Sequence, residues 1–410
     1  MASRSPTSEQ RTAGGFLPGI EVLRGLAAVA VVFHHSWSLS TEPHFFGYRI
    51  IEGFGEWGVD LFFFLSGFLL AEYFWHRERH PSVRSFYVRR FFRIAPAYYV
   101  NMVILFLLLA EHSLLFSPQG LRQTIANLSF TQYLTPGTSS SLNVNGAMWT
   151  LTIEMMLYLF MPLMALLMLR RPWGTVGTLV GVGLAWRLYV ARLATGTGVE
   201  RLAFGAHNTV PEGISRLFLQ RQFIGILPLF ALGMGLRWLM INGRLPRWAL
   251  APVRRPRLGV LVLLLVPSVL ALEFVERGLN YQHWIWFSLY DLVLCVLMMP
   301  ALLYAARPVL GQLSRAMRPA LWVGERSYGL YLWHFPVILL VYGRGALVHP
   351  PHLSYIWVRL PVIFVVSLIL AAVSYAFIEH PAREFGRRLS RPRPSTAAAA
   401  ATKAVEVGVA

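Results

Sequence analysis

The sequence contains a single cysteine and few charged residues. Cys295 lies inside an apolar run, so no disulfide framework can form, and a catalytic thiol is not expected without an activating group nearby. Charged residues make up 14% of the chain, well below the roughly 25% of an ordinary soluble domain, whereas hydrophobic residues make up 56%. This balance indicates a polytopic membrane protein.

Acidic residues and lysine are also scarce. The 19 Asp and Glu residues are outnumbered by 37 basic residues, and Lys403 is the sole lysine. The arginines cluster between apolar runs, which is typical of loops on the cytoplasmic side of a membrane rather than of a nucleic-acid-binding surface. We therefore expect membrane lipid, and no nucleic acid, as a partner.

Signatures of nucleotide and metal binding are missing too. The chain has no Walker loop and no dinucleotide fingerprint after a strand, so neither ATP nor NAD chemistry is expected. His34 and His35 are adjacent and point about 100° apart on a helix, unlike the i, i+4 spacing of a helical metal site. We expect no metal and no permanently bound cofactor.

Ten apolar segments are long enough to cross about 30 Å of hydrocarbon. They lie near 20–38, 57–75, 94–115, 147–169, 173–191, 223–241, 258–275, 284–305, 321–342 and 357–378. We therefore predict an all-α polytopic membrane protein with about ten transmembrane helices in one bundle. The expected parts are a disordered tail (1–15), a membrane domain (16–385) and a disordered, basic, Ala-rich tail (386–410).

The distribution of Lys and Arg sets the expected orientation of these segments. With the N-terminus inside, most basic residues fall in the cytoplasmic segments, above all in 76–93 and 237–257. Both termini are then expected in the cytoplasm. Residues 112–146 are expected to form the longest external loop, which is long enough to fold over the mouth of a cavity.

Three ionisable side chains share one face of the first apolar segment. Arg24 and His35 are eleven positions apart, and at about 100° per residue this interval returns to within roughly 20° of the starting direction. Glu21 precedes Arg24 by three positions and joins the same stripe. Such groups are costly in a bilayer and usually face a protein interior or a water-filled cavity, so the stripe is a candidate functional site.

Four polar groups are expected to meet in the middle or outer half of the bundle: His35, Asp60, Glu154 and His334. An imidazole there can take a proton from a hydroxyl that attacks a carbonyl, while a carboxylate orients the ring and stabilises its charged form. His35 is the candidate base. The sequence leaves open that the histidines are structural and that Asp60 serves in capping or packing.

Arg89, Arg90 and Arg93 lie at the predicted inner end of the third segment. Arginines at i and i+3 beside a helix N-terminus suit phosphate oxygens. Anchoring of the cytoplasmic end of the segment explains the same cluster equally well.

Six sequence blocks follow one another along the chain. They are 23–27 with His35; 58–68; 90–96; 149–151 with Glu154 and Tyr158; 327–328 with Tyr331, Leu332 and His334; and 379–381. Together they resemble the acyltransferase-3 family of integral-membrane O-acyltransferases, over residues 19–381. Leu157 departs from the family pattern, which often has an aromatic residue there, and we expect it to affect pocket shape rather than chemistry.

The resemblance implies a ten-span enzyme of the bacterial cytoplasmic membrane. It would take an acyl group, acetyl or another short acyl, from cytoplasmic acyl-CoA and deliver it to a hydroxyl of a sugar, a glycan or a macrolide-like secondary metabolite. Many glycan-modifying relatives carry an extra hydrolase-like domain that follows the membrane domain. We expect this chain to act without one, which favours a stand-alone enzyme, including one that acylates antibiotics.

The resemblance also implies roles for individual residues. The family's essential Arg and His fall on Arg24 and His35, and its Arg-x-x-Arg pair falls on Arg90 and Arg93. His35 would deprotonate the acceptor, and Arg24 would hold the donor or the catalytic helix. Arg90 and Arg93 would bind the phosphates of CoA, and Glu154 would hold His35 or the acceptor. The expected substrate-binding residues are Asp60, Tyr158, Tyr328 and His334.

A proton-coupled secondary transporter or flippase of a glycan or lipid is the alternative. It would use the same buried ionisable groups as a proton relay. The order of the six blocks argues against it. A transporter would also move its substrate without consuming acyl-CoA.

The predicted topology can be tested with cysteine substitutions at Arg84 and Arg247, which lie in two strongly basic segments, 76–93 and 237–257. Both cysteines should resist membrane-impermeant thiol reagents in intact cells, because these segments are expected inside. Ready labelling of either from outside would contradict the ten-span orientation.

Overall fold

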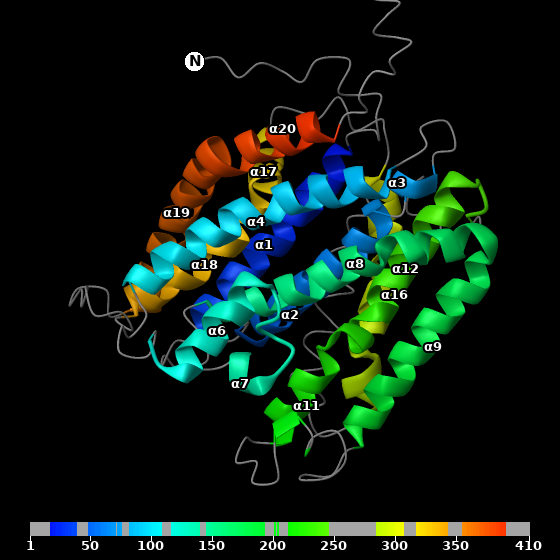
Figure 1. The fold of residues 1–410 in the computed structure, drawn as a ribbon, viewed down its shortest axis with the longest axis horizontal. Coiled ribbons are helices and arrows are strands. Elements are labelled where there is room, and N and C mark those ends of the chain that lie inside the picture. Colours follow the sequence, from blue (N-terminus) through cyan, green and yellow to red (C-terminus); the bar gives the residue numbers. More distant parts are fainter. Residues whose placement is uncertain are drawn as a thin grey trace, which may run out of the picture.

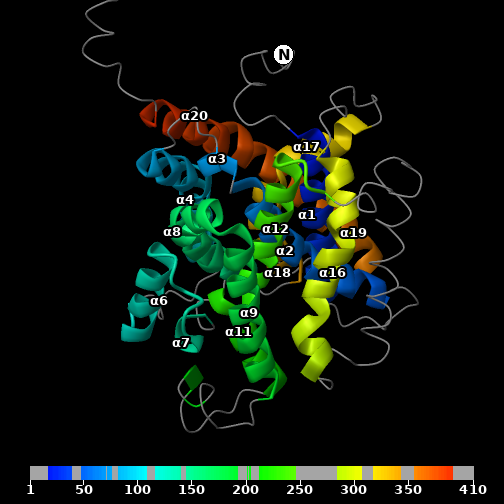
Figure 2. The same ribbon diagram turned by 90° about the vertical axis from the view of Figure 1, so that its right-hand side faces the viewer.

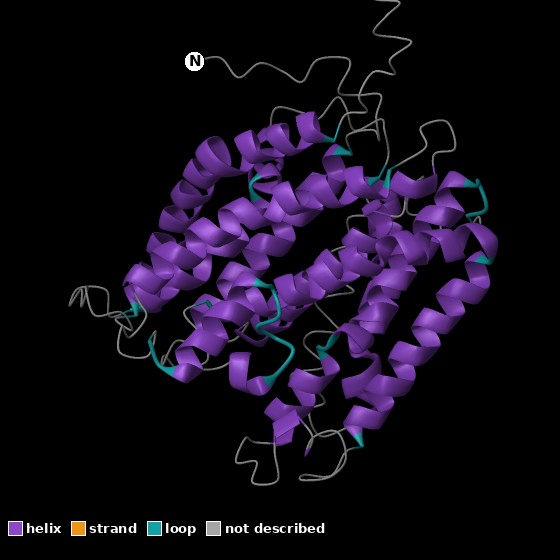
Figure 3. Cartoon of the chain, viewed as in Figure 1, coloured by secondary structure: helices purple, strands orange, loops and turns teal. Residues whose placement is uncertain are grey.

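The structure is a computed structural model that describes residues 17–38, 48–70, 72–75, 82–108, 116–139, 145–192, 201, 203–204, 212–245, 284–306, 317–342 and 355–390. Nearly all of these residues are helical, and none of them forms a strand (Figure 3). The all-α class predicted from the sequence is therefore confirmed. The predicted tail 1–15 and residues 391–410 lie outside the described residues.

The helices follow one another as α1 (Pro18–Ser38), α2 (Tyr48–Leu70), α3 (Glu72–Trp75), α4 (Val83–Leu108), α6 (Pro118–Leu128), α7 (Pro136–Ser139), the 3-10 turn η3 (Gly146–Met148), α8 (Trp149–Arg170), α9 (Pro172–Ala191), α11 (Glu212–Gln220), α12 (Phe223–Ile241), α16 (Trp284–Ala305), α17 (Arg318–Glu325), α18 (Ser327–Val341), α19 (Ile356–Ser374), the π-helical turn η7 (Tyr375–Glu379) and α20 (His380–Leu389).

Seven helices in the described part of the chain are long and apolar enough to cross a membrane. They are Trp57–Trp75, Val83–Leu107, Gly146–Arg170, Pro172–Ala191, Phe223–Ile241, Phe287–Ala305 and Ile356–Leu389. The helix α1, which carries Glu21 and Arg24, is not among them, and α18 has only 15 residues. The predicted segment 258–275 lies outside the described residues. A multi-pass helical protein is thus supported, but the predicted count of about ten spans is not confirmed.

Several helix ends differ from the predicted segments. α4 begins at Val83 rather than near residue 94, because α20 packs along its first turns and the Phe92 and Phe385 rings meet there, with centroids 5.2 Å apart. The arginines of these turns lower the local hydropathy without interrupting the helix. Segment 321–342 is divided into α17 and α18 at Arg326, and α20 continues across the predicted boundary between 385 and 386.

The helices pack as one bundle. α1 contacts α2, α16, α17, α18 and α19, whereas α12 contacts α2 and α9, and α4 contacts α20. Figures 1 and 2 show α17, α20 and the start of α1 at one end of the bundle and α6, α7 and α11 toward the other. We call these the α20 end and the α11 end. The predicted external loop 112–146 holds α6, whose first turn is capped by the Ser117 hydroxyl, at the α11 end.

Two glycines allow α2 and α12 to cross at close range. A Cβ at Gly67 would lie 2.0 Å from the carbonyl oxygen of Phe230, and a Cβ at Gly233 would lie 2.1 Å from that of Phe64. Any larger residue would push the helices apart, which is why small residues are favoured where membrane helices cross. The close crossing fixes α2, which lines the cavity described below.

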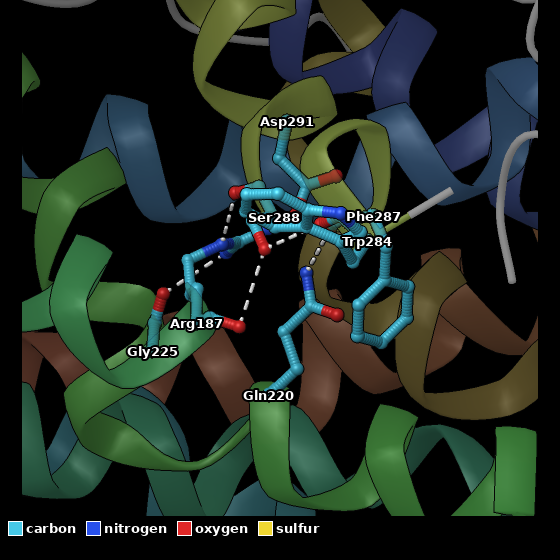
Figure 4. A network of polar contacts seen from close by, with 7 residues as sticks. All are labelled: Arg187, Gln220, Gly225, Trp284, Phe287, Ser288 and Asp291. Atoms are coloured by element: carbon cyan, nitrogen blue, oxygen red, sulfur yellow. Dashed lines mark hydrogen bonds and ion pairs between the residues drawn. The ribbon is translucent and has the colours of Figure 1, made fainter. Parts of the chain in front are cut away.

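A fully buried arginine joins α9, α12 and α16 (Figure 4). Arg187 Nε donates to the carbonyl oxygen of Ser288 (2.8 Å), Nη1 donates to that of Gly225 (3.0 Å), and Nη2 forms an ion pair with Asp291. At the end of α11, Gln220 Nε2 donates to the backbone of α16 (2.6 Å). These bonds satisfy a charge that would otherwise be costly inside the bundle, so the network ties the α11 end together.

Replacing Arg187 should destabilise the protein. Arg187→Met leaves the Asp291 carboxylate without its cation and three helices without their shared donor, a change expected to cost about 3–5 kcal/mol. Thermal unfolding in detergent measures the loss, with Arg170→Met at an exposed position of α8 as the matched control. Equal unfolding temperatures for the two variants would contradict a stabilising role for this network.

Candidate functional site

A cavity of about 130 Å³ lies among α1, α2, α4, α8 and α18. Arg24, Arg90 and Arg93 line one part of it, together with Glu154 and Tyr158. Its remaining lining is mostly apolar: Val59, Phe62, Phe63, Leu65, Leu69, Leu70, Ile94 and Leu151, with Ser66, Thr150, Ser327, Tyr328 and Tyr331. We call it the arginine cavity. It combines a strongly positive region with an apolar wall.

The three arginines of the cavity differ in what they bind. Arg24 Nη1 forms an ion pair with both carboxylate oxygens of Glu21, at 3.0 and 3.2 Å. Arg90 lies over the rings of Phe86 and Tyr158, 5.6 and 5.8 Å from their centroids. Arg93 makes no hydrogen bond or ion pair with any of the described residues, although it lies within electrostatic range of acidic side chains. A partly buried guanidinium of this kind is ready to bind an anion.

The structure places Arg90 and Arg93 differently from the position predicted for them. The sequence places them at a helix start, but α4 begins at Val83, so both lie beyond its first turn. The free amides and the dipole of a helix N-terminus act within that first turn and are not available here. The positive character of the cavity therefore comes from the guanidinium groups.

Glu154 and Tyr158 form a hydrogen-bonded pair one turn apart on α8, with the Tyr158 hydroxyl donating to Glu154 Oε1. Both side chains line the arginine cavity. Tyr328 also lines it, but its hydroxyl donates to the carbonyl oxygen of Ile94 (2.9 Å), which fixes α18 against α4. Glu154 thus lies beside the arginines and makes no hydrogen bond to His35.

The two histidines predicted for the site are in direct contact. His35 Nδ1 lies 2.8 Å from His334 Nε2, and the rings are within 15° of parallel. His334 is fully buried, and its Nδ1 lies 2.7 Å from the carbonyl oxygen of Tyr331 and 3.2 Å from that of Leu330. The contact joins α1 to α18.

These contacts determine the tautomers of the pair. A carbonyl oxygen only accepts hydrogen bonds, so His334 Nδ1 carries a proton and donates it. Neutral His334 then accepts at Nε2, and His35 must donate from Nδ1. In neutral His35 the lone pair is therefore on Nε2, the nitrogen that can act as a base.

His34 points elsewhere, as its position on the helix predicts. It packs against α2 at Gly55, where a Cβ would lie 1.8 Å from the His34 Cβ. Its ring meets that of His35 edge to face, with centroids 5.2 Å apart. The two adjacent histidines therefore contact different helices, and only His35 contacts His334 within the described part of the chain.

Tyr331 lies between the arginine cavity and the histidine pair. It lines the cavity, and its ring centroid is 5.7 Å from that of His334. Its hydroxyl donates to the carbonyl oxygen of Ala147 (2.7 Å) and lies 2.9 Å from Thr150 Oγ1. Phe62 packs edge to face on the same ring, at 6.0 Å. Tyr331, with Phe62 packed on it, is thus both part of the cavity lining and a neighbour of the histidine pair; we call these two rings the aromatic layer.

The four groups expected to meet are thus divided among three places. His35 and His334 form a pair, Glu154 belongs to the arginine cavity, and Asp60 is absent from the lining of that cavity. Asp60 instead lies within electrostatic range of Cys295 on α16. Among the described residues, no group of three or more His, Cys, Asp or Glu side chains is close enough to hold a metal ion.

Two contributions to the site were missed in the sequence. The partner of His35 is an imidazole where a carboxylate was expected, and the spacing of Tyr331 and His334 on one face of α18 was the available signal. Arg221, between α11 and α12, interacts electrostatically with His35 and lies over the Trp149 ring, 5.1 Å from its centroid. No sequence pattern singled it out.

The chain is similar in sequence to several known proteins. The peptidoglycan O-acetyltransferase OatA of Listeria monocytogenes is 27% identical over 403 residues, which cover 90% of this chain and 56% of the relative. The O-acetyltransferase OatA of Staphylococcus aureus is 25% identical (90% and 58%), and the putative peptidoglycan O-acetyltransferase YrhL of Bacillus subtilis is 25% identical (91% and 56%). The chain thus spans little more than half the length of these relatives.

No solved structure matches the chain. A family model described as an acyltransferase domain matches residues 17–378, which hold the arginine cavity and the histidine pair. The chain therefore belongs to the acyltransferase-3 family of integral-membrane O-acyltransferases.

Proposed function

We propose that this protein transfers a short acyl group, acetyl in the first instance, from acyl-CoA to a hydroxyl of a glycan. The observation that carries the proposal is the histidine pair, in which His35 Nδ1 donates to His334 Nε2 and His35 Nε2 is left as the base. The relatives named above are O-acetyltransferases, two of them described as acting on peptidoglycan, which supports a cell-wall glycan as acceptor.

In the proposed reaction, His35 Nε2 takes the proton of the acceptor hydroxyl as its oxygen attacks the thioester carbonyl. The C–O bond forms, the C–S bond breaks, and the proton on His35 passes to the departing thiolate of CoA. His334 holds the His35 ring in the required tautomer and accepts its Nδ1–H throughout, a role that a carboxylate fills in other catalytic pairs. Glu154 lines the arginine cavity and is hydrogen-bonded to Tyr158, so the proposal assigns the orientation of His35 to His334 alone.

The arginine cavity is the proposed site for the donor. CoA carries several phosphate charges, and Arg93 has no partner among the described residues, while Arg24 and Arg90 line the same space. The apolar wall, including Phe62 and Leu65, suits the uncharged part of the donor. Acyl-CoA acts as a substrate here, and no bound cofactor is invoked.

The proposed orientation places the α20 end in the cytoplasm of a bacterium, with the chain in the cytoplasmic membrane. The arginine cavity then receives the donor from inside, and the histidine pair lies toward the acceptor outside. The arginines of α4 and α20 at that end support this orientation, because basic residues favour the cytoplasmic side.

Mass spectrometry of cell-wall glycans, lipids and secreted metabolites, with and without this chain, tests the acceptor. Loss of an acetyl group from a glycan would support the proposal. Loss of an acyl group from a macrolide-like metabolite would instead identify the second acceptor class. A transport defect with every acyl group unchanged and no acyl-CoA consumed would favour the transporter.

The base assignment is tested by substitutions in the pair. His35→Ala should lower the rate of acyl transfer about 10²–10⁴-fold, the usual loss for a positioned general base, with insertion and folding retained. His34→Ala should be tolerated much better because His34 packs on α2. Consumption of acyl-CoA and the mass of the acceptor are followed together. Near-normal activity of His35→Ala would exclude it as the base.

His334 should affect the rate of acyl transfer because its Nε2 accepts the hydrogen bond from His35 Nδ1. His334→Gln can still accept the His35 Nδ1–H, whereas His334→Ala cannot, so the Gln variant should keep more activity. The same assay compares the two. If both variants are equally active, His334 does not set the tautomer of His35.

The donor site is tested at the arginines. Arg93→Ala and Arg90→Ala each remove a charge-assisted contact worth about 1.5–3 kcal/mol, so the KM for acyl-CoA should rise about ten- to a hundredfold. Arg89→Ala is the matched control, because Arg89 is exposed and its Nε donates to Ser390 Oγ on the side of α20 (2.8 Å). Unchanged donor kinetics in the first two variants would leave these arginines as topology anchors.

A further inference from the structure

Glu379, the last residue of the turn between α19 and α20, begins one of the six sequence blocks, and the function proposed above gives it no role. Residues Tyr375–Glu379 form a single π-helical turn inside a continuous helix. Such turns are rare, and they occur often at functional sites. The last residue of the turn, Glu379, is buried, with 1% of its surface exposed.

Both oxygens of the Glu379 carboxylate accept a hydrogen bond. Oε2 accepts from Arg383 Nη2 (2.9 Å), and Oε1 accepts from Ser374 Oγ (3.2 Å). Gly329 of α18 makes room for it, since a Cβ at that position would lie 2.7 Å from Oε1. The absence of a side chain at residue 329 thus lets α18 pass directly beside the carboxylate.

Glu379 lies close to the arginine cavity. It interacts electrostatically with Arg93 and Arg24, both of which line the cavity, while Arg383 and Arg93 repel each other. Repulsion between like charges is much stronger at low dielectric than in water. The Glu379 carboxylate interacts favourably with all three arginines. Glu21 and Glu154 also interact favourably with Arg93.

The helix that carries Glu379 and Arg383 is anchored to the helix that carries Arg93. The rings of Phe385 on α20 and Phe92 on α4 are in contact, and Gly386 allows the close approach, since a Cβ there would lie 2.6 Å from the Phe92 Cβ. The distance between the carboxylate and Arg93 is therefore set by packing.

We propose that Glu379 is a positioning residue for the acyl donor. Its charge offsets the repulsion between Arg383 and the cavity arginines, so that Arg93 stays directed into the cavity and available to the phosphates of the donor. Arg383 in turn keeps Glu379 from pairing with Arg93 directly. The inference rests on the proposed function, because it deepens the account of the donor site.

The first test is Glu379→Gln, which keeps the size of the side chain and removes its charge. The KM for acyl-CoA should rise about tenfold, while kcat changes less than about twofold, because the reacting groups are untouched. Glu384→Gln is the matched control on the same helix: it removes a carboxylate that pairs with Arg387 and Arg388 at the surface, and its KM should stay at the wild-type value.

The second test is a double-mutant cycle with Arg383→Gln. Arg383→Gln alone should also raise the KM, because the freed carboxylate then pairs with Arg93. The double variant E379Q/R383Q should return the KM to within about threefold of wild type, because the opposing charges are removed together. This pair of measurements remains decisive if Glu379→Gln alone does not fold.

The outcomes separate this inference from the proposed function. An additive cycle, a loss of kcat without a change in KM, or a double variant whose KM stays as high as that of Arg383→Gln would overturn the positioning role. If Arg93→Ala raises the donor KM and Glu379→Gln does not, only the inference about Glu379 fails. If neither variant affects the donor KM, the proposed donor site itself is wrong.

Discussion

The hydrogen bond between His35 and His334 joins the two helices on which the site depends. It is available only because α1 and α18 pack side by side and because the backbone of α18 fixes the proton on His334 Nδ1. A neutral imidazole pair also has a low desolvation cost inside a membrane protein. In the reaction proposed above it would provide a base and an orienting partner without a net charge, whereas a buried carboxylate must first lose its hydration.

Carboxylates in the described part of the chain form ion pairs with arginines in or beside the helix bundle. Glu21 pairs with Arg24, Asp291 pairs with Arg187, and Glu379 pairs with Arg383. In each case a charge at or near the helix bundle is matched locally, which lowers the desolvation cost of both partners. Arg90 and Arg93 are different, because neither forms an ion pair among the described residues. We propose above that the anionic donor binds beside these two arginines.

The sequence predicts those parts of the site that depend on one helix at a time. Helical periodicity places Arg24 and His35 on one face and turns His34 away, and apolar runs locate most of the helices. It does not reveal the partner of His35, because His334 is 299 residues away and tertiary packing decides which helices meet. For the same reason Glu154 was expected beside His35 but lies beside the arginines. The start of α4 was missed because arginines within its first turns resemble a loop in hydropathy.

The aromatic layer of Phe62 and Tyr331 matters for the electrical insulation of the membrane. The Tyr331 ring lines the cavity and lies beside His334, Phe62 packs on it, and its hydroxyl lies 2.9 Å from Thr150 Oγ1. An ion entering this layer would lose its hydration, so the layer is a barrier to current. A neutral acyl group carries no such hydration penalty. A bundle built in this way can expose charged groups to water from one side while the cell keeps its proton gradient.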